Sequence, residues 1–257
     1  MRRLRTAGRL CVLLLFGSLG LYAQYLQAVP KPTPDNAEQR ATVMWKWLQD
    51  WPNLARYRQA DQELGAPKAG EHRVVFMGDS ITDMWNLAQY FPGKPYVNRG
   101  ISGQTTSQML VRFRQDVIDL HPKVVVVLAG TNDIAGNTGP ITLEEIERNF
   151  QSMSDLAHAN GIKLVLSSIT PINNYTLRSK LFFAERSPEK IVALNKWLKQ
   201  YASEHGYMYL DYFTPMVDEN GMLKKDLASD GLHPNDTGYK IMVPLAEKAI
   251  EQAMAGA

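Results

Sequence analysis

Cysteine is almost absent from the sequence, because Cys11 is the only one among 257 residues. A fold stapled by disulfide bonds is therefore excluded. A transmembrane helix needs about 20 apolar residues, and the apolar stretch Leu10–Leu21 has only twelve. With 45% hydrophobic residues, the chain is nevertheless able to fill a substantial core, which argues against disorder.

The apolar stretch follows the basic segment MRRLR, an arrangement typical of a secretory signal peptide. We expect residues 1–23 to be cleaved on export and residues 24–36, which contain three prolines, to form a linker. The expected location is secreted or periplasmic, with no stable membrane insertion after cleavage. Retention of the leader as an anchor is the alternative.

An excess of charge of one sign is also missing. The net charge is +2, but residues 1–23 contain four arginines and no acid, so the remainder has 24 basic and 26 acidic residues. Proteins that bind nucleic acids usually have an excess of basic residues. The mature chain has no such excess, so its charge does not support a nucleic-acid partner. The sequence does not indicate an oligomeric state.

Residues 37–257 are expected to form one domain, which begins with an amphipathic helical segment over 37–64 that is broken near Pro52. Two interpretations of its tryptophans, Trp47 and Trp51, are open. They either stack on a sugar or pack in the core, and the helical spacing favours the core.

From Arg73 onward, short apolar runs alternate with helical patterns. Strands are expected at 73–78, 95–98, 123–129, 162–168 and 207–212, and helices from 81, over 105–120, from Thr142 to Gly161, over 188–205 and over 236–253. Five strands separated by helices predict an α/β fold, a three-layer sandwich around a parallel sheet. Ligands of such sheets bind at the carboxyl ends of the strands.

The first of these strands ends in MGDS, which places Ser80 at a strand-to-helix turn. A serine hydroxyl becomes a nucleophile when a histidine, itself oriented by a carboxylate, accepts its proton. The segment DGLHPN supplies Asp230 and His233 three residues apart. Asp79 beside the serine is expected to cap the following helix.

An acyl-transfer site also needs hydrogen-bond donors for the oxyanion. The Ser80 amide is one candidate, and the GISG and GTND segments after two other strands offer a glycine amide and the Asn132 side chain. The zinc motif HExxH is missing, and no metal or cofactor is expected. The GxSxG motif of the α/β-hydrolase fold is missing as well.

Together, the blocks MGDS, NRGISGQTT, GTND and DGLHPN resemble those of the SGNH (GDSL) hydrolases, a family of esterases and lipases. The resemblance implies a flavodoxin-like α/β/α sandwich. It also implies a triad of Ser80, His233 and Asp230, and an oxyanion hole formed by Ser80 N–H, Gly103 N–H and Asn132. Its GISGQTT and GTND blocks are most similar to the platelet-activating-factor acetylhydrolase and acetylesterase branches, which favour short acyl groups.

The leading hypothesis is an exported serine esterase that removes acetyl or other short acyl groups from a carbohydrate or another polar alcohol. The alternatives are a lysophospholipase or thioesterase acting on longer chains, an acyltransferase with the same triad, and a noncatalytic binding module. Residues 170–187 form an unusually long connection. They include Tyr175, Arg178, Phe182, Phe183 and Arg186, and we expect this segment to shape the acyl or alcohol pocket.

Overall fold

A five-stranded parallel sheet forms the centre of the computed structural model, which describes residues 41–42, 45 and 48–256. Its spatial order is β2-β1-β3-β4-β5. The strands are β1 (Val74–Gly78), β2 (Tyr96–Gly100), β3 (Val124–Leu128), β4 (Lys163–Ser167) and β5 (Met208–Leu210). The strand order reverses between β1 and β3, and ligands bind in the crevice at such a switch point.

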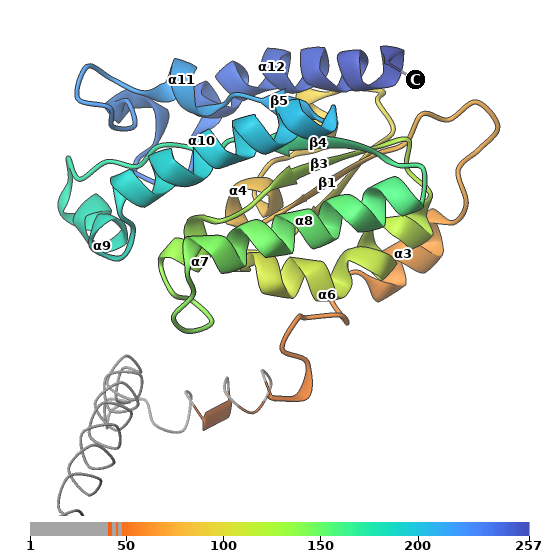
Figure 1. The fold of residues 1–257 in the computed structure, drawn as a ribbon, viewed down its shortest axis with the longest axis horizontal. Coiled ribbons are helices and arrows are strands. Elements are labelled where there is room, and N and C mark those ends of the chain that lie inside the picture. The colour runs from red at the N-terminus through yellow and green to blue at the C-terminus, as the bar shows by residue number, and fades with distance from the viewer. Residues whose placement is uncertain (1–40, 43–44, 46–47, 257) are drawn as a thin grey trace, which may run out of the picture. The chain divides into compact units, whose positions relative to one another are not determined.

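Helices cover both faces of this sheet (Figure 1). One face packs against α6 (Thr106–Asp116), α8 (Leu143–Ala159) and α10 (Pro188–His205), and the other against α4 (Ser80–Asp83), α5 (Leu87–Tyr90) and α12 (Asp236–Ala255). Alternate residues of β1 serve the two layers, since Val75 and Met77 belong to the first core and Val74 and Phe76 to the second. The expected three-layer α/β sandwich is confirmed.

Local sequence signals explain several helix ends. Thr142 and Glu145 form the expected capping box before α8, with the Glu145 amide 3.2 Å from Thr142 Oγ1. Ser187 caps α10 and Pro188 occupies its first turn. The prediction of one helix over 105–120 is wrong in its last turn. In the structure α6 ends at Asp116, and Ile118–Leu120 forms a separate 3-10 turn.

The connection over 170–187 is not a loop, because it contains α9 (Leu177–Glu185). Thr176 caps this helix, and Ser179 completes the capping box. Serine replaces the usual Glu or Gln at that position, so the sequence signal was not recognised. Four further helices of the described residues were also not predicted as separate elements: α3 (Arg58–Leu64), α5, α7 (Thr131–Ile134) and α11 (Phe213–Met216). The helix predicted from 81 is in fact the two short helices α4 and α5.

The N-terminal segment differs from the prediction in its burial. A turn at Trp51 and Pro52 interrupts it, as expected. However, Leu48 is 79% exposed and Trp51 is 37% exposed, so the core-packing interpretation of Trp51 is wrong. Helical periodicity shows which residues share a face, but it does not show that a partner covers that face. Trp47, the leader and the linker lie outside the described residues.

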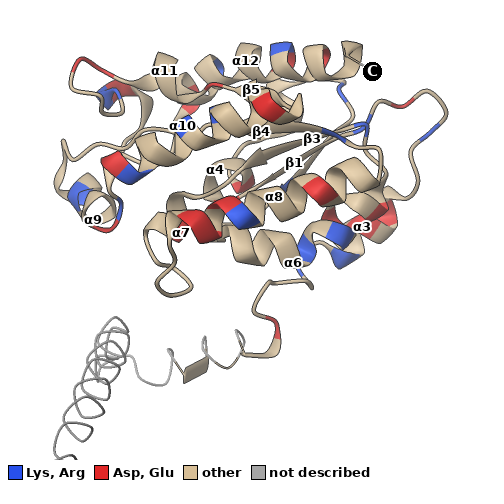
Figure 2. Ribbon diagram, in the orientation of Figure 1, with Lys and Arg blue, Asp and Glu red and all other residues tan. Residues whose placement is uncertain are grey.

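The chain divides into two units, Met1–Trp45 and Lys46–Ala257, and the sheet with its helices belongs to the second. Side chains of both charge signs occur along α8, α10 and α12 (Figure 2). In the part of the chain that the structure describes, no helix has the length and apolarity needed to cross a bilayer.

Candidate active site

Ser80 lies at the carboxyl end of β1, at the switch point of the sheet. It is the first residue of α4, and Asp79 Oδ1 caps this helix by accepting a hydrogen bond from Ile81 N–H at 3.0 Å. The turn requires Gly78, since a Cβ there would lie 2.1 Å from Thr82 Oγ1 and 2.9 Å from the Leu128 carbonyl oxygen. The expected capping role of Asp79 is confirmed.

His233 reaches Ser80 from the segment before α12. Its Nε2 lies 2.9 Å from Ser80 Oγ, and its Nδ1 lies 2.7 Å from Asp230 Oδ2. The other Asp230 oxygen, Oδ1, accepts from the backbone N–H groups of Leu232 at 3.1 Å and His233 at 2.9 Å. The structure thus brings together the three residues of the predicted triad, which are far apart in the sequence.

The charge state of Asp230 suits the orientation of an imidazole. Burial raises its pKa, but hydrogen bonds from the His233 side chain and from the His233 and Leu232 amides outweigh burial and hold the pKa below its ordinary value. The carboxylate is therefore ionised at neutral pH. It fixes the proton on Nδ1 and leaves Nε2 free to accept a proton from Ser80.

Asn132 lies in α7, which follows β3, beside the segment that follows β2. Its Nδ2 donates to the Gln104 carbonyl at 3.1 Å, while its Oδ1 accepts from Arg186 Nη2 at 3.0 Å. Gly103, which directly precedes Gln104, is exposed and has a φ of 81°. The Asn132 side chain is therefore held against the segment that contains Gly103 and Gln104.

Arg186 is the residue of this site that sequence reasoning assigned differently. We expected it to face a substrate pocket, yet it is only 4% exposed and also donates through Nε to Thr131 Oγ1 at 3.2 Å. Phe182, one turn earlier, meets the Arg186 guanidinium at 5.5 Å and the His233 ring edge-on at 5.6 Å. The α9 segment therefore contacts both the histidine and the asparagine.

Asp79 is fully buried next to the serine, and its Oδ2 has no hydrogen-bond partner. Burial raises the pKa of this carboxyl to about 7, against the hydrogen bond from Ile81 N–H and the charge of Arg186, which lower it. An unpaired charge at this position is unfavourable, so the carboxyl releases its proton only near neutral pH.

We expect the stability of the wild type relative to Asp79→Asn to fall as the pH rises. The folded-state pKa of about 7 exceeds the ordinary value of 3.8. The stabilisation that protonated Asp79 gives the folded state is therefore complete below about pH 4 and is lost as the pH rises through 7. Urea unfolding gives the difference in free energy of unfolding between the wild type and Asp79→Asn. This difference should change by at least about 1 kcal/mol between pH 5 and pH 8. A constant difference would contradict a buried, titrating Asp79.

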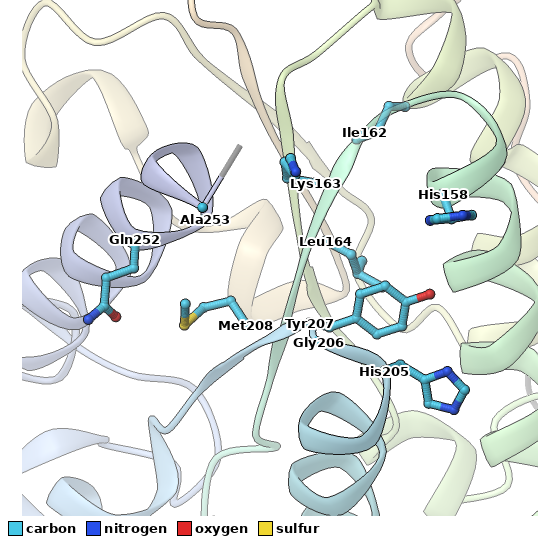
Figure 3. Close-up of a pocket in the computed structure, with 11 residues that line it drawn as sticks. His158, Ile162, Lys163, Leu164, His205, Gly206, Tyr207, Met208, Gln252 and Ala253 are labelled. Carbon is cyan, nitrogen blue, oxygen red and sulfur yellow. The ribbon is translucent and has the colours of Figure 1, made fainter.

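A cavity lies at the amino ends of strands β4 and β5, away from the serine (Figure 3). Its volume is about 260 Å³, and His158, Lys163, His205 and Tyr207 are among the residues that line it. These side chains lie at the beginnings of β4 and β5 and at the ends of α8 and α10, whereas the serine lies at the carboxyl edge. Among the described residues, no three His, Cys, Asp or Glu side chains cluster as a metal site would require.

Comparison with known proteins finds a family and several similar proteins. The model of the GDSL-like lipase/acylhydrolase family matches residues 76–241. A GDSL-like lipase from Bacteroides thetaiotaomicron is 42% identical with a TM-score of 0.72, and the match covers 79% of this chain and 98% of that one. The uncharacterized lipoprotein YqeF of Bacillus subtilis is 29% identical over 48% of this chain, which spans 58% of the lipoprotein.

A third match concerns the fold. An acetylxylan esterase from Geobacillus stearothermophilus is 22% identical, with a TM-score of 0.58 over 70% of this chain and 94% of that one.

Proposed function

Because the chain belongs to the GDSL-like lipase/acylhydrolase family and is a hydrolase of carboxylic esters, we propose that it removes acetyl or other short acyl groups from a carbohydrate or another polar alcohol. The observation that carries the mechanism is the continuous hydrogen-bonded series from Ser80 through His233 to Asp230. It matches the requirement of an activated serine nucleophile.

In the proposed reaction, Ser80 Oγ forms a bond to the ester carbonyl carbon while its proton passes to His233 Nε2. The tetrahedral intermediate collapses, the C–O bond to the alcohol breaks, and His233 returns the proton to the departing alcohol oxygen. Water, deprotonated by His233, then attacks the acyl-enzyme and releases the acid. Asp230 stabilises the imidazolium that forms in both stages.

The negative oxygen of the intermediate would be bound by the Ser80 amide, the Gly103 amide and Asn132 Nδ2. Two facts support this assignment. Ser80 N–H lies at the N-terminus of α4, where amides are free to bind negative charge. In addition, the Asn132 amide can only present its donor toward the Gly103 side, because Arg186 is a donor and must meet Oδ1.

A short acyl group and a polar alcohol are supported by the acetylesterase-like GISGQTT and GTND blocks and by the fold likeness to an acetylxylan esterase. We propose further that the protein acts outside the cytoplasm. The basic and apolar start of the sequence and the similarity to a lipoprotein are the reasons for this.

Hydrolysis of p-nitrophenyl esters from C2 to C12 tests the substrate class. We expect kcat/KM to be highest for C2 and to fall at least about tenfold by C8, because a site built for an acetyl group excludes longer chains. Ser80→Ala is the control for background hydrolysis. An optimum at C8 or longer would contradict the short-acyl proposal.

One observation favours the longer-chain alternative, a lysophospholipase or thioesterase. Leu177 and Leu181 lie four residues apart on α9 and are 86% and 71% exposed. They leave an apolar strip on the helix that contacts His233 through Phe182. The same ester series distinguishes this function, since an acyl chain bound along the strip would raise kcat/KM with length.

A further inference from the structure

The turn that carries Trp51 is held by hydrogen bonds against α6 and the loop before it. Three glutamine side chains donate to its backbone carbonyls: Gln104 to Pro52 at 2.6 Å, Gln108 to Trp51 at 2.7 Å and Gln115 to Leu54 at 2.7 Å. Gln104 and Gln108 are themselves buried, and their amide oxygens accept from Arg112 and Thr105. The orientation of both donors is therefore fixed.

Despite this attachment, the Trp51 side chain remains 37% exposed. It lines a hollow of about 430 Å³ between the beginnings of α6 and α8, two helices that lie side by side (Figure 1). The polar side chains of the hollow are Ser107, Thr138, Glu145, Arg148 and Asn149. An exposed aromatic ring on a backbone turn that is held by hydrogen bonds, with polar groups around it, is typical of a binding site for a polar ligand with an apolar face.

The polar groups retain capacity for hydrogen bonds. Asn149 Nδ2 donates to Thr106 and Ser107, which leaves its Oδ1 as an acceptor. Glu145 uses Oε2 for the Thr142 amide, which leaves Oε1. The Arg148 side chain is exposed and supplies donors. Donors and acceptors beside an aromatic face match the hydroxyl groups and the C–H face of a pyranose.

The hollow is next to the proposed oxyanion site. The loop between α7 and α8 forms one wall of the hollow through Thr138, whose Oγ1 lies 3.2 Å from Thr105 Oγ1. Asn137, the preceding residue, donates to the Gly103 carbonyl at 2.9 Å. The loop over 137–138 therefore contacts Gly103 on one side and lines the hollow on the other.

We propose that Trp51 and the polar side chains of this hollow form a subsite for a pyranose unit of the alcohol part of the substrate. This inference rests on the proposed carbohydrate esterase function and adds a residue that selects the alcohol. Trp51 stacks on the sugar face, and Arg148, Asn149 and Glu145 bind its hydroxyl groups.

The first test compares two substrates, acetylated xylo-oligosaccharide and p-nitrophenyl acetate, in Trp51→Ala, Trp51→Phe and the wild type. For Trp51→Ala we expect kcat/KM on the oligosaccharide to fall at least about tenfold, mainly through KM, and kcat/KM on p-nitrophenyl acetate to stay within about twofold. Trp51→Phe should reduce kcat/KM on the oligosaccharide by a smaller factor, because it keeps an aromatic ring. Val111→Ala, which truncates a 51% exposed side chain of α6 outside the hollow, should change neither. Equal losses on both substrates, or no loss on either, would overturn the subsite.

The second test measures binding without turnover. Isothermal titration of the full chain with xylotetraose, cellotetraose and N-acetylchitotetraose should detect at least one complex, and Trp51→Ala should weaken it about tenfold or more. Binding through Trp51 without Ser80-dependent ester hydrolysis would contradict the proposed function but keep the subsite. Absence of binding to all three sugars, with hydrolysis intact, would overturn the subsite alone.

Discussion

Ser80→Ala is expected to lower kcat on p-nitrophenyl acetate by at least about 10⁴-fold, because no other group in the site can form the acyl-enzyme. The melting temperature should stay close to that of the wild type. The Ser80 side chain has one hydrogen bond, to His233, and the helix cap at this turn belongs to Asp79. Steady-state kinetics and thermal unfolding of both proteins measure the two quantities.

His233→Ala should cause a loss of similar size, and the double variant should be no slower than either single variant. Residues that act as one unit show such non-additivity, since removal of the base already leaves the serine inactive. A double variant that loses the product of both effects would contradict the coupling of Ser80 and His233. So would a Ser80→Ala protein that retains more than about a tenth of wild-type kcat.

Asn132→Ala is expected to lower kcat by about 100- to 1000-fold, the usual cost of an oxyanion donor. Arg186→Gln should lower kcat by about 10- to 100-fold, although Arg186 is expected to contact no substrate atom. Without the guanidinium, only the hydrogen bond from Nδ2 to the Gln104 carbonyl orients the Asn132 amide, so its donor is held less firmly toward the developing negative charge. The KM of p-nitrophenyl acetate should change less than kcat in both variants.

The double variant Asn132→Ala/Arg186→Gln identifies the route of this effect. If Arg186 acts through Asn132, its replacement should cost little further kcat once the asparagine is gone. Arg114→Gln is the matched control, because its side chain is 66% exposed and its ion pair with Asp119 is long, at 3.8 Å. Losses that multiply in the double variant would indicate a separate role, such as support of the fold.

The sequence predicts the sheet and the serine turn well because their signals are local. The run KVVVVLA reads as a strand buried on both faces, and Val124–Leu128 is fully buried. The helix expected over 188–205 is confirmed as α10. Ser80, Asn132 and His233 could be placed together because each follows a predicted strand or stands in a recognisable block, and the carboxyl ends of parallel strands meet at one edge.

The features that the sequence does not reveal depend on partners far along the chain. Arg186 lies 54 residues from Asn132, and no local pattern distinguishes an arginine that will be buried from one that stays in solvent. Trp51 has the spacing of a core residue, yet the glutamines attach only its backbone and leave the ring exposed. The four-residue helix α7 is too short to produce a periodic signal.

The central claim is that Ser80 carries the acyl group. The most direct measurement is mass spectrometry of the protein after reaction with a fluorophosphonate, which forms a stable adduct with an activated serine. We expect one adduct per chain on the peptide that contains Ser80, slow labelling of His233→Ala, and none of Ser80→Ala. An adduct on another residue, or equal labelling of Ser80→Ala, would contradict the account.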